Sequence, residues 1–265
     1  MDISSKIRNV FIYGTAWAVL IFLYFPLLII VWYSFNSAAV SSFPIERYSL
    51  EWYRVMFQDE SLLAAVRNSF IVALTGTALA VVIGLPAAYA IHRYTFPGRS
   101  LLERLILMPI TLPGIVTGVA MLSFFPLAGI PLSLTAVTIG HITFLMAIVI
   151  TQMTGRFKRL DPALEQAAYD LGATPLRAFF SVILPNIRTA LIGAVLLCLV
   201  LSMDEIPVTF FLIARENTLP IEIYGMMRRG ITPEVNAIST LVFTGSSIAI
   251  FLSLYLSGSE QKPAH

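Results

Sequence analysis

Two adjacent carboxylates, Asp204 and Glu205, stand inside a long apolar run and are candidates to attract a cation. A carboxylate within a membrane span costs a few kcal/mol unless it faces a cavity or a partner. Pro207 follows closely and removes a backbone hydrogen bond, which favours an opening of the helix there. One interpretation is a cation-attracting element beside a transport path. The other is a carboxylate near the outer end of a span that is solvated or paired with Arg215.

A second candidate for contact with an amine is Tyr224, because a cation is attracted to the face of an aromatic ring. It lies in the segment Leu219–Met227, which we expect to form a short helix near the outer mouth of a transport path. The favoured alternative is an interfacial tyrosine at the depth of the lipid headgroups.

The remaining reactive side chains give little support to enzymatic chemistry. The three histidines, His92, His141 and His265, are scattered and lack the spacing of metal ligands, and the single cysteine, Cys198, excludes a disulfide framework. We expect His141 to be hydrogen-bonded between helices rather than to relay protons. No Gly-Lys dipeptide occurs, so the phosphate-binding loop G-x-x-x-x-G-K-[ST] is missing. We therefore predict neither a catalytic set nor a metal site, and no cofactor bound by this chain.

The composition is that of a membrane protein. Apolar residues make up 57% of the 265 residues and charged residues only 12%, about half of what a soluble domain carries. A soluble chain of this length would have to present too much of this apolar surface to water. Lipid is the solvent that explains it.

The apolar residues group into six segments, each long enough to cross a bilayer core, which takes about 20 residues in a helix. We predict an all-α polytopic protein, a single domain over residues 1–265, with the spans 10–35, 65–91, 101–126, 132–154, 188–214 and 237–257. The runs lack the alternation of barrel strands. Gly114 and Gly118 have the spacing that lets two helices approach closely, and we expect them to pack against another helix, with a second subunit as one candidate partner.

Six spans place both termini on one side of the membrane, and the positive charges indicate which side. Eleven of the 17 Lys and Arg residues fall on the side of the termini and six on the other. The positive-inside rule then predicts cytoplasmic termini and a cytoplasmic loop over residues 155–187, with the 36–64 loop outside.

The cytoplasmic loop carries two predicted helices in its segment Asp161–Pro185. Asp161 with Pro162 begins the first helix and Gly172 ends it; Thr174 with Pro175 begins the second, which runs to Leu184 before Pro185 stops it. Leu164, Ala167, Ala168 and Leu171 recur at helical spacing and form a small, shallow apolar face. This pattern predicts a helix that docks on another protein, with an amphipathic helix on the lipid headgroups as the weaker alternative.

The same loop resembles a known family. Gln166-Ala167-Ala168, three residues, Gly172, nine residues and then Val182-Ile183-Leu184-Pro185 is similar to the EAA loop of bacterial ABC importer permeases, with the pattern EAA, three residues, G, nine residues and I-x-L-P. Gln166 replaces the usual Glu, and the adjacent Glu165 keeps an acidic residue nearby. The resemblance implies that Glu165, Gln166, Ala167, Ala168, Gly172, Leu184 and Pro185 couple this chain to an ATPase.

Shorter blocks over nearly the whole chain resemble the PotC type of permease from spermidine/putrescine importers. These blocks are 112–116, 140–144, 201–205 and 232–237. The resemblance implies the type I (MetI-like) permease fold in a bacterial inner membrane and a non-catalytic role in polyamine import. It also implies a heterodimer with a PotB-like permease, two copies of an ABC ATPase that uses ATP and Mg, an extracytoplasmic substrate-binding protein, and no nucleic acid.

Other functions remain as alternatives. Related permeases carry opines, aminophosphonates and other small polar solutes such as amino-acid derivatives. An ion-coupled secondary transporter would usually show inverted repeats or paired broken helices, and no clear internal repeat is present.

Overall fold

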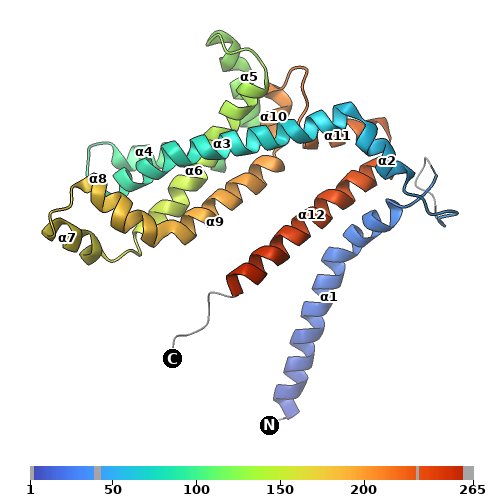
Figure 1. Cartoon of the computed structure of the whole chain (residues 1–265), viewed down its shortest axis with the longest axis horizontal. Coiled ribbons are helices and arrows are strands. Elements are labelled where there is room, and N and C mark those ends of the chain that lie inside the picture. Colours follow the sequence, from blue (N-terminus) through green and yellow to red (C-terminus); the bar gives the residue numbers. More distant parts are fainter. Residues whose placement is uncertain (1–2, 39–42, 231–232, 259–265) are drawn as a thin grey trace. The chain divides into compact units, whose positions relative to one another are not determined.

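The structure is a computed structural model that describes residues 3–38, 43–230 and 233–258, with the side chains of 3–8, 10 and 249–258 outside this description. The chain divides into two compact units (Figure 1). Unit 1 joins the chain up to Glu60 with the chain from Ile223 onward, and unit 2 runs from Ser61 to Glu222.

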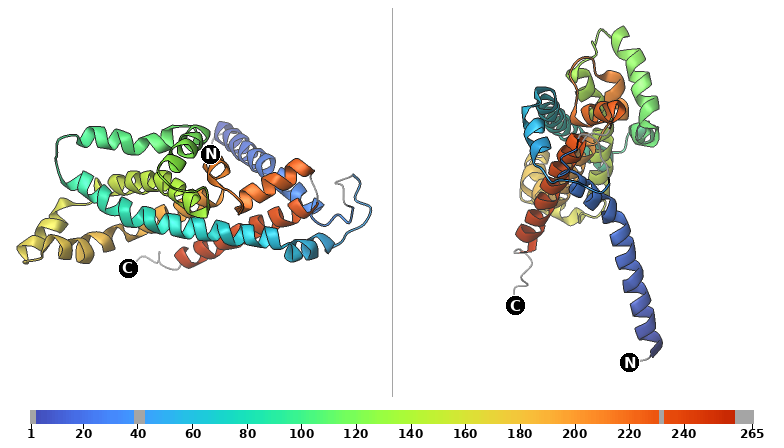
Figure 2. Two further views of the ribbon diagram at one scale, coloured as in Figure 1. Left: turned by 90° about the horizontal axis from the view of Figure 1, so that it is seen from above. Right: turned by 90° about the vertical axis from the view of Figure 1, so that its right-hand side faces the viewer.

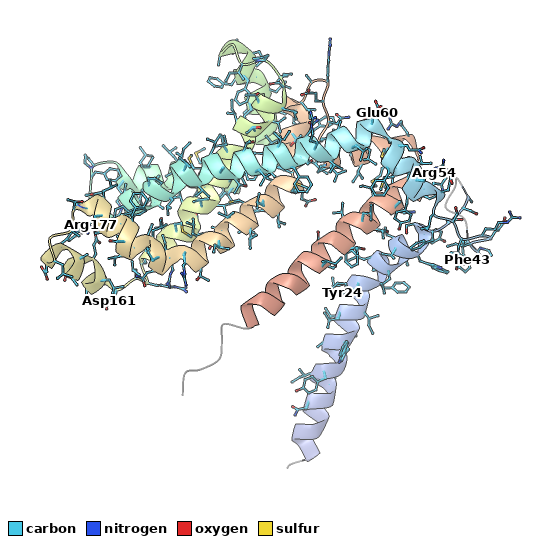
Figure 3. All side chains as sticks on the ribbon, in the orientation of Figure 1. Tyr24, Phe43, Arg54, Glu60, Asp161 and Arg177 are labelled. Atoms are coloured by element: carbon cyan, nitrogen blue, oxygen red, sulfur yellow. The ribbon has the colours of Figure 1, made fainter. Side chains whose placement is uncertain are left out.

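Unit 1 is built on the long helices α1 (Ile3–Tyr33) and α12 (Pro233–Gly258), which pack against each other. The short helix α2 (Glu51–Gln58), in the loop predicted to be outside, packs on α12. From residue 11 to 26 every side chain of α1 is exposed, and most of them are apolar; Tyr24 is one of them (Figure 3). Such a helix is stable in lipid, because its backbone groups are satisfied within the helix and its surface is apolar.

Unit 2 contains the remaining helices and the loop between the spans. In chain order these are α3 (Glu60–Arg93), α4 (Arg99–Thr111), α5 (Gly114–Leu127), α6 (Leu134–Phe157), α7 (Pro162–Asp170), α8 (Pro175–Ala178), the π-helical segment η1 (Phe179–Ile183), α9 (Leu184–Met203), α10 (Pro207–Leu212) and the start of α11 (Leu219–Arg229). The helices α7 and α8 lie at one end of this unit, beside the end of α3 (Figure 1; Figure 2, left).

The core of unit 2 forms where α3, α6 and α9 meet. Its largest fully buried side chains include Leu145, Met153 and Phe157 on α6. Small residues let these helices come close: a Cβ at Gly84 on α3 would lie 3.1 Å from Cβ of Val149. Close approach at small residues is how helices associate in a membrane, where apolar burial gives no drive.

The apolar helices confirm most of the predicted spans. In the part of the chain that the structure describes, four helices are long and apolar enough to cross a membrane: Phe11–Tyr33, Glu60–Arg93, Leu134–Phe157 and Pro175–Met203. The bent pair α4 and α5 makes up to five. The all-α fold class is confirmed. The sixth predicted span, 237–257, falls on α12, where the side chains of 249–258 lie outside the described residues, so a total of six stays a prediction.

Two predicted spans differ from the structure. The segment 101–126 is two helices bent by 105° at Leu112 and Pro113, because Pro113 cannot donate the backbone hydrogen bond that would continue α4. The segment 188–214 is not one helix but has the opening predicted beside Pro207: α9 ends at Met203, and α10 begins anew at Pro207.

Candidate functional site

The two short helices of the 155–187 loop begin where the sequence predicts. Asp161 caps α7 by accepting from the Ala163 N–H at 2.9 Å, and Thr174 caps α8 by accepting from the Arg177 N–H at 3.4 Å. Asp161 and Arg177 mark the two helices in Figure 3. The turn that ends α7 passes through Gly172 with φ +81°, a left-handed conformation that favours glycine. These local rules confirm the predicted loop helices.

The end of the second helix was predicted wrongly. Pro185 does not stop it, because the chain passes from α8 through η1 directly into α9, with Pro185 in the first turn of α9. In η1 the hydrogen bonds reach five residues back, as from the Leu184 N–H to the Phe179 carbonyl. This wider turn changes which backbone groups are hydrogen-bonded just before the proline. The Asn186 side chain donates to the Val182 carbonyl at 2.8 Å.

The helix α7 has an exposed face that carries four of the predicted docking residues: Leu164, Gln166, Ala167 and Leu171. Leu171 is 89% exposed, so its side chain is open to contact with another protein. Ala168 departs from the predicted face, since it is buried against its own chain. The exposed face of α7 is therefore narrower than predicted, with Gln166 as an uncharged polar group on it.

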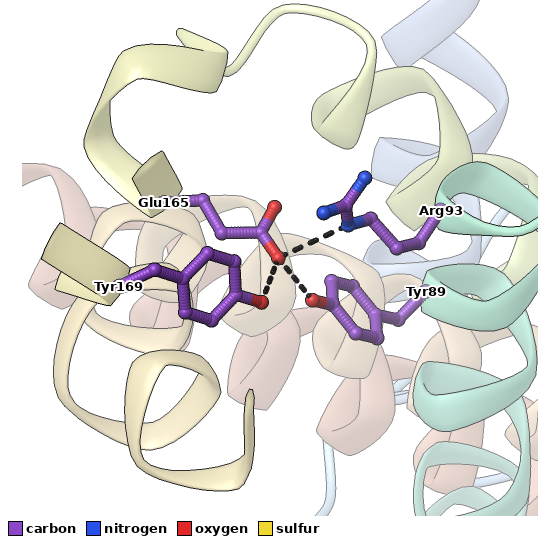
Figure 4. Close-up of polar contacts among 4 residues, drawn as sticks. All are labelled: Tyr89, Arg93, Glu165 and Tyr169. Atoms are coloured by element: carbon purple, nitrogen blue, oxygen red, sulfur yellow. Dashed lines mark hydrogen bonds and ion pairs between the residues drawn. The ribbon is translucent and has the colours of Figure 1, made fainter. Parts of the chain in front are cut away.

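Glu165 points the other way, into the chain, where its side chain is only 16% exposed (Figure 4). Its Oε1 accepts from the Tyr89 hydroxyl at 2.8 Å and from the Tyr169 hydroxyl, and lies 3.2 Å from Nε of Arg93. We call these four residues the Glu165 cluster. Tyr89 and Arg93 come from the end of α3, so the cluster ties α7 to a membrane-spanning helix.

The charge state of Glu165 follows from these contacts. Burial on its own would raise its pKa, but the hydrogen bonds from Tyr169 and Tyr89 and the charge of Arg93 outweigh burial and hold the pKa below its ordinary value. The same hydrogen bond to Glu165 raises the pKa of Tyr169, whose hydroxyl therefore stays protonated and able to donate. The cluster holds a carboxylate and its donors at neutral pH.

Tyr89 is the centre of the packing around this cluster. Its ring makes edge contacts with Phe157 at the end of α6 and Phe179 in η1, with centroid distances of 5.7 and 5.1 Å. Beside it lies a cavity of about 180 Å³, lined by Tyr89, His92, Arg93, Phe157, Leu160, Asp161, Pro162, Glu165 and Ile183. Apolar packing between α7 and the ends of α3 and α6 is thus incomplete, and the polar contacts of Glu165 connect the helices beside this cavity.

Three members of the Glu165 cluster were not predicted: Tyr89, Arg93 and Tyr169. Each pair is visible in the sequence as two polar residues on one face of a helix. Tyr89 and Arg93 are four residues apart, and so are Glu165 and Tyr169. The pairing of the two faces depends on a contact 76 residues apart in sequence, which helical spacing does not reveal.

The predicted carboxylates Asp204 and Glu205 lie in the break between α9 and α10, at a cavity of about 340 Å³ within unit 2. We call it the carboxylate cavity. Glu205 is engaged in the fold, because its two carboxylate oxygens accept from the Val208 N–H at 3.0 and 3.2 Å and so cap α10. Asp204 is exposed, and in the described part of the chain it has no ion pair with Arg215. The two neighbours thus have different surroundings.

His141 holds the two helices on either side of this break. Its ring nitrogens lie 2.8 Å from Oγ of Ser202 on α9 and 2.8 Å from Oγ1 of Thr209 on α10. The ring is 1% exposed. This confirms a histidine hydrogen-bonded between helices, and the arrangement fixes the broken segment from α6.

Glycines let α10 sit deep among the other helices. A Cβ at Gly118 on α5 would lie 2.7 Å from Cδ2 of Phe211, and one at Gly140 on α6 would lie 2.7 Å from Cδ1 of Leu212. At Gly114 it would lie 2.9 Å from Cβ of Pro207. The close approach predicted for Gly114 and Gly118 is therefore present, but its partner is α10 of the same chain.

Tyr224 lies on α11 in unit 1, while the carboxylate cavity belongs to unit 2. The predicted short helix is confirmed as Leu219–Arg229. The guanidinium of Arg228 lies 5.9 Å from the centroid of the Tyr224 ring, so a cation of the chain itself already approaches the ring. Among the described residues, no group of three or more His, Cys, Asp or Glu side chains is placed to hold a metal ion.

Comparisons with known proteins agree with this architecture. The family model described as "Binding-protein-dependent transport system inner membrane component" matches residues 80–259. The putrescine transport system permease protein PotI of Escherichia coli K12 is 34% identical over 91% of this chain and 88% of its own length. The spermidine/putrescine transport system permease protein PotC of the same strain is 31% identical over 94% of each.

A solved structure gives the same fold. A chain of a bacterial ABC transporter involved in the import of the acidic polysaccharide alginate superposes with a TM-score of 0.73 at 16% identity and covers 99% of both chains. At this identity the likeness concerns the fold, which is that of an ABC importer permease. Together with the family match and the two relatives, it shows that this chain belongs to the binding-protein-dependent transport system inner membrane components, the non-catalytic permease subunits of ABC importers.

Proposed function

We propose that this permease is driven by a separate ATPase that docks on the exposed face of α7. The observation that carries the proposal is the division of α7 into two sides, with Leu171 and Ala167 exposed while Glu165 is held within the chain. A helix anchored on one side and apolar on the other suits the binding of a second protein. Gly172, Leu184 and Pro185 shape the turn and the start of α9 that carry this helix.

The complete importer would contain this chain, a second PotB-like permease, two copies of the ATPase and an extracytoplasmic binding protein. ATP and Mg would be used by the ATPase alone. With the six predicted spans, a cytoplasmic ATPase on the exposed face of α7 would mean that both termini are cytoplasmic, in agreement with the eleven-to-six division of positive charges. The carboxylate cavity would then lie along the path between the two sides of the membrane.

The solute that this chain suits best is a polyamine such as putrescine or spermidine. The names of PotI and PotC support this class, and so does the exposed carboxylate of Asp204 at the carboxylate cavity. A protonated amine would offset the cost of a carboxylate held at membrane depth. Glu205 would contribute to the negative potential while capping α10, and Tyr224 would meet the amine outside this cavity, on α11.

The experiment is reconstitution. The chain is purified with its cognate ATPase, second permease and binding protein, placed in proteoliposomes, and supplied with ATP and radiolabelled putrescine or spermidine. We expect ATP-dependent uptake of a polyamine that is competed by the other polyamine and unaffected by sulfate or a neutral sugar. Uptake driven by an ion gradient without ATP would refute the ATPase proposal, and uptake of a non-cationic solute alone would refute the polyamine.

The coupling part has a separate measurement. Leu171→Asp would place a charge at the C-terminal end of the exposed face of α7 without touching the Glu165 cluster. We expect the ATPase to be lost from the purified complex. Leu127→Asp on α5, where the parent leucine is 87% exposed, serves as the matched control. Retention of the ATPase by Leu171→Asp would show that this face is not the docking surface.

A further inference from the structure

The Glu165 cluster is placed between the proposed docking helix and the membrane core. Three donors converge on the single atom Oε1 of Glu165, and two of them, Tyr89 and Arg93, belong to α3. The third, Tyr169, lies one turn along α7 and orients the carboxylate from its own helix. The contacts therefore connect α7 to α3 across a sequence distance of more than 70 residues.

We propose that Glu165 is a positioning residue that fixes α7 to the end of α3, so that a displacement of α7 moves α3 with it. This inference rests on the proposed docking of an ATPase on the exposed face of α7. It differs from a role of Glu165 in touching the ATPase, because the carboxylate points away from that face (Figure 4).

The covalent connections of α7 do not supply this link. On one side α7 joins α6 through the turn 158–161, and on the other it joins α8 through Leu171–Thr174, which includes the glycine turn. Neither connection leads to α3, whose last helical residue is Arg93. A motion of α7 reaches α3 directly through contacts between side chains, and otherwise only by way of α6, which packs on α3.

Those contacts are mainly polar at the point where α7 faces α3. The cavity of about 180 Å³ beside Glu165 leaves part of the interface unfilled, so dispersion contacts are lost there. Hydrogen bonds to a charged group are stronger than those between neutral groups, and three of them meet at one carboxylate. Tyr89 extends the link, because its ring also packs on Phe157 of α6 and Phe179 of η1.

The neighbouring position is consistent with this division of roles. Gln166 lies on the exposed side of α7 and carries no charge, while the acidic residue beside it is directed inward. The ATPase would meet the exposed apolar residues together with Gln166 and Asp170, and the carboxylate of Glu165 would serve the internal link.

The test uses the complete importer in proteoliposomes with two variants, Glu165→Gln and Tyr89→Phe. The first removes the charge at nearly constant shape, and the second removes one hydroxyl while keeping the packing of the ring. Glu103→Gln is the matched control, since Glu103 forms an exposed ion pair with Arg99 on α4 at 3.0 Å. Three quantities are measured: the ATPase that co-purifies, the ATP hydrolysed per solute imported, and the hydrogen exchange of the α7 amides.

We expect both variants to retain the ATPase, and the control to match the parent in all three measurements. Loss of hydrogen bonds to a charged group should raise exchange of the α7 amides about tenfold in Glu165→Gln and less in Tyr89→Phe. The ATP used per solute should rise in the same order. In the double variant the effects should be less than additive, because both changes break one link.

Each result bears on the inference separately from the docking proposal. If the parent complex contains no ATPase, the docking proposal fails. If the parent holds the ATPase and Glu165→Gln loses it, Glu165 contacts the ATPase and the inference is overturned. Unchanged exchange and unchanged ATP per solute in Glu165→Gln would also overturn it while leaving the docking proposal intact.

Discussion

Gly172 allows the geometry of the loop to be tested with single substitutions. Its φ of +81° lies in the left-handed region, and a Cβ built there meets no atom of the chain within 4 Å. A substitution at this position is therefore strained by the backbone alone, with no crowding inside the chain. Because crowding within the chain plays no part, the expected energetic costs of the variants can be ranked by residue type.

The magnitudes follow from the residue placed there. An alanine in the left-handed region costs about 1–2 kcal/mol, whereas asparagine visits this region more readily and costs less. Aspartate shares part of that tolerance, but its charge at the C-terminal end of α7 opposes the helix dipole by about 0.3–1 kcal/mol. We expect the damage to increase in the order Asn, then Asp, then Ala. A change of about 1–2 kcal/mol shifts the population of a correctly formed turn by roughly five- to thirtyfold.

The assay is the ATP hydrolysed per solute imported by the reconstituted complex, together with the ATPase that co-purifies. Gly172→Asp and Gly172→Ala should uncouple hydrolysis from transport, and Gly172→Asn should do so least. Gly155→Ala is the matched control, because Gly155 lies inside α6, has no left-handed φ, and a Cβ there also meets nothing within 4 Å.

Two results would refute this reasoning. Normal coupling in Gly172→Ala would mean that the left-handed turn is not needed for coupling. Equal loss in all three Gly172 variants would mean that the partner crowds this position, so that size rather than backbone strain decides the outcome.

Four further predictions concern the polar groups of unit 2. Asp204→Asn should raise the half-saturating polyamine concentration about tenfold, if one charge-assisted contact is lost, with assembly unchanged; equal uptake by variant and parent would remove Asp204 from the pathway. Glu205→Gln weakens the cap of α10 and should lower the thermal midpoint of the detergent-solubilised complex, by an energy of about 0.5–2 kcal/mol. His141→Leu breaks two interhelical hydrogen bonds and should cost about 1–3 kcal/mol by the same assay; an unchanged midpoint would show that these bonds add nothing. The pKa of Glu165 is lowered in the fold, so its contribution is complete above the ordinary carboxyl value of 4.5 and is lost as pH falls through the folded pKa. The protection of the α7 amides against hydrogen exchange should therefore stay constant between pH 6 and 8 and fall only in acid. A loss of protection near pH 7 would contradict this.

The elements that the sequence predicts well are those set by neighbouring residues. Asp161 and Thr174 cap their helices, and Gly172 takes a left-handed turn, because each outcome depends on a few consecutive residues. The apolar runs predict membrane helices for the same reason, since length and hydropathy are local properties.

The errors occur where the backbone has more than one way to accommodate a proline. Pro185 was expected to end a helix, but the π-helical segment Phe179–Ile183 lets the chain continue into α9. At Pro207, by contrast, the predicted opening of the helix is present: the chain breaks there, and the side chain of Glu205 caps a new helix. The residue type is the same in both places, and the difference lies in the hydrogen-bond partners that surround it.

The helix α9 connects the two regions to which function is assigned. It begins at Leu184, within the last residues of the coupling loop, and ends at Met203, directly before Asp204. Its 20 residues span about 30 Å at 1.5 Å per residue, close to the thickness of a bilayer core. The end at Asp204 is held to α6 by His141 through Ser202, so α9 is tied at that end by hydrogen bonds as well as by packing. The other end meets the π-helical segment, a type of turn often found at functional sites. A displacement of the loop would therefore be taken up first at the π-helical segment, and whatever remains would act along α9 on the carboxylate cavity.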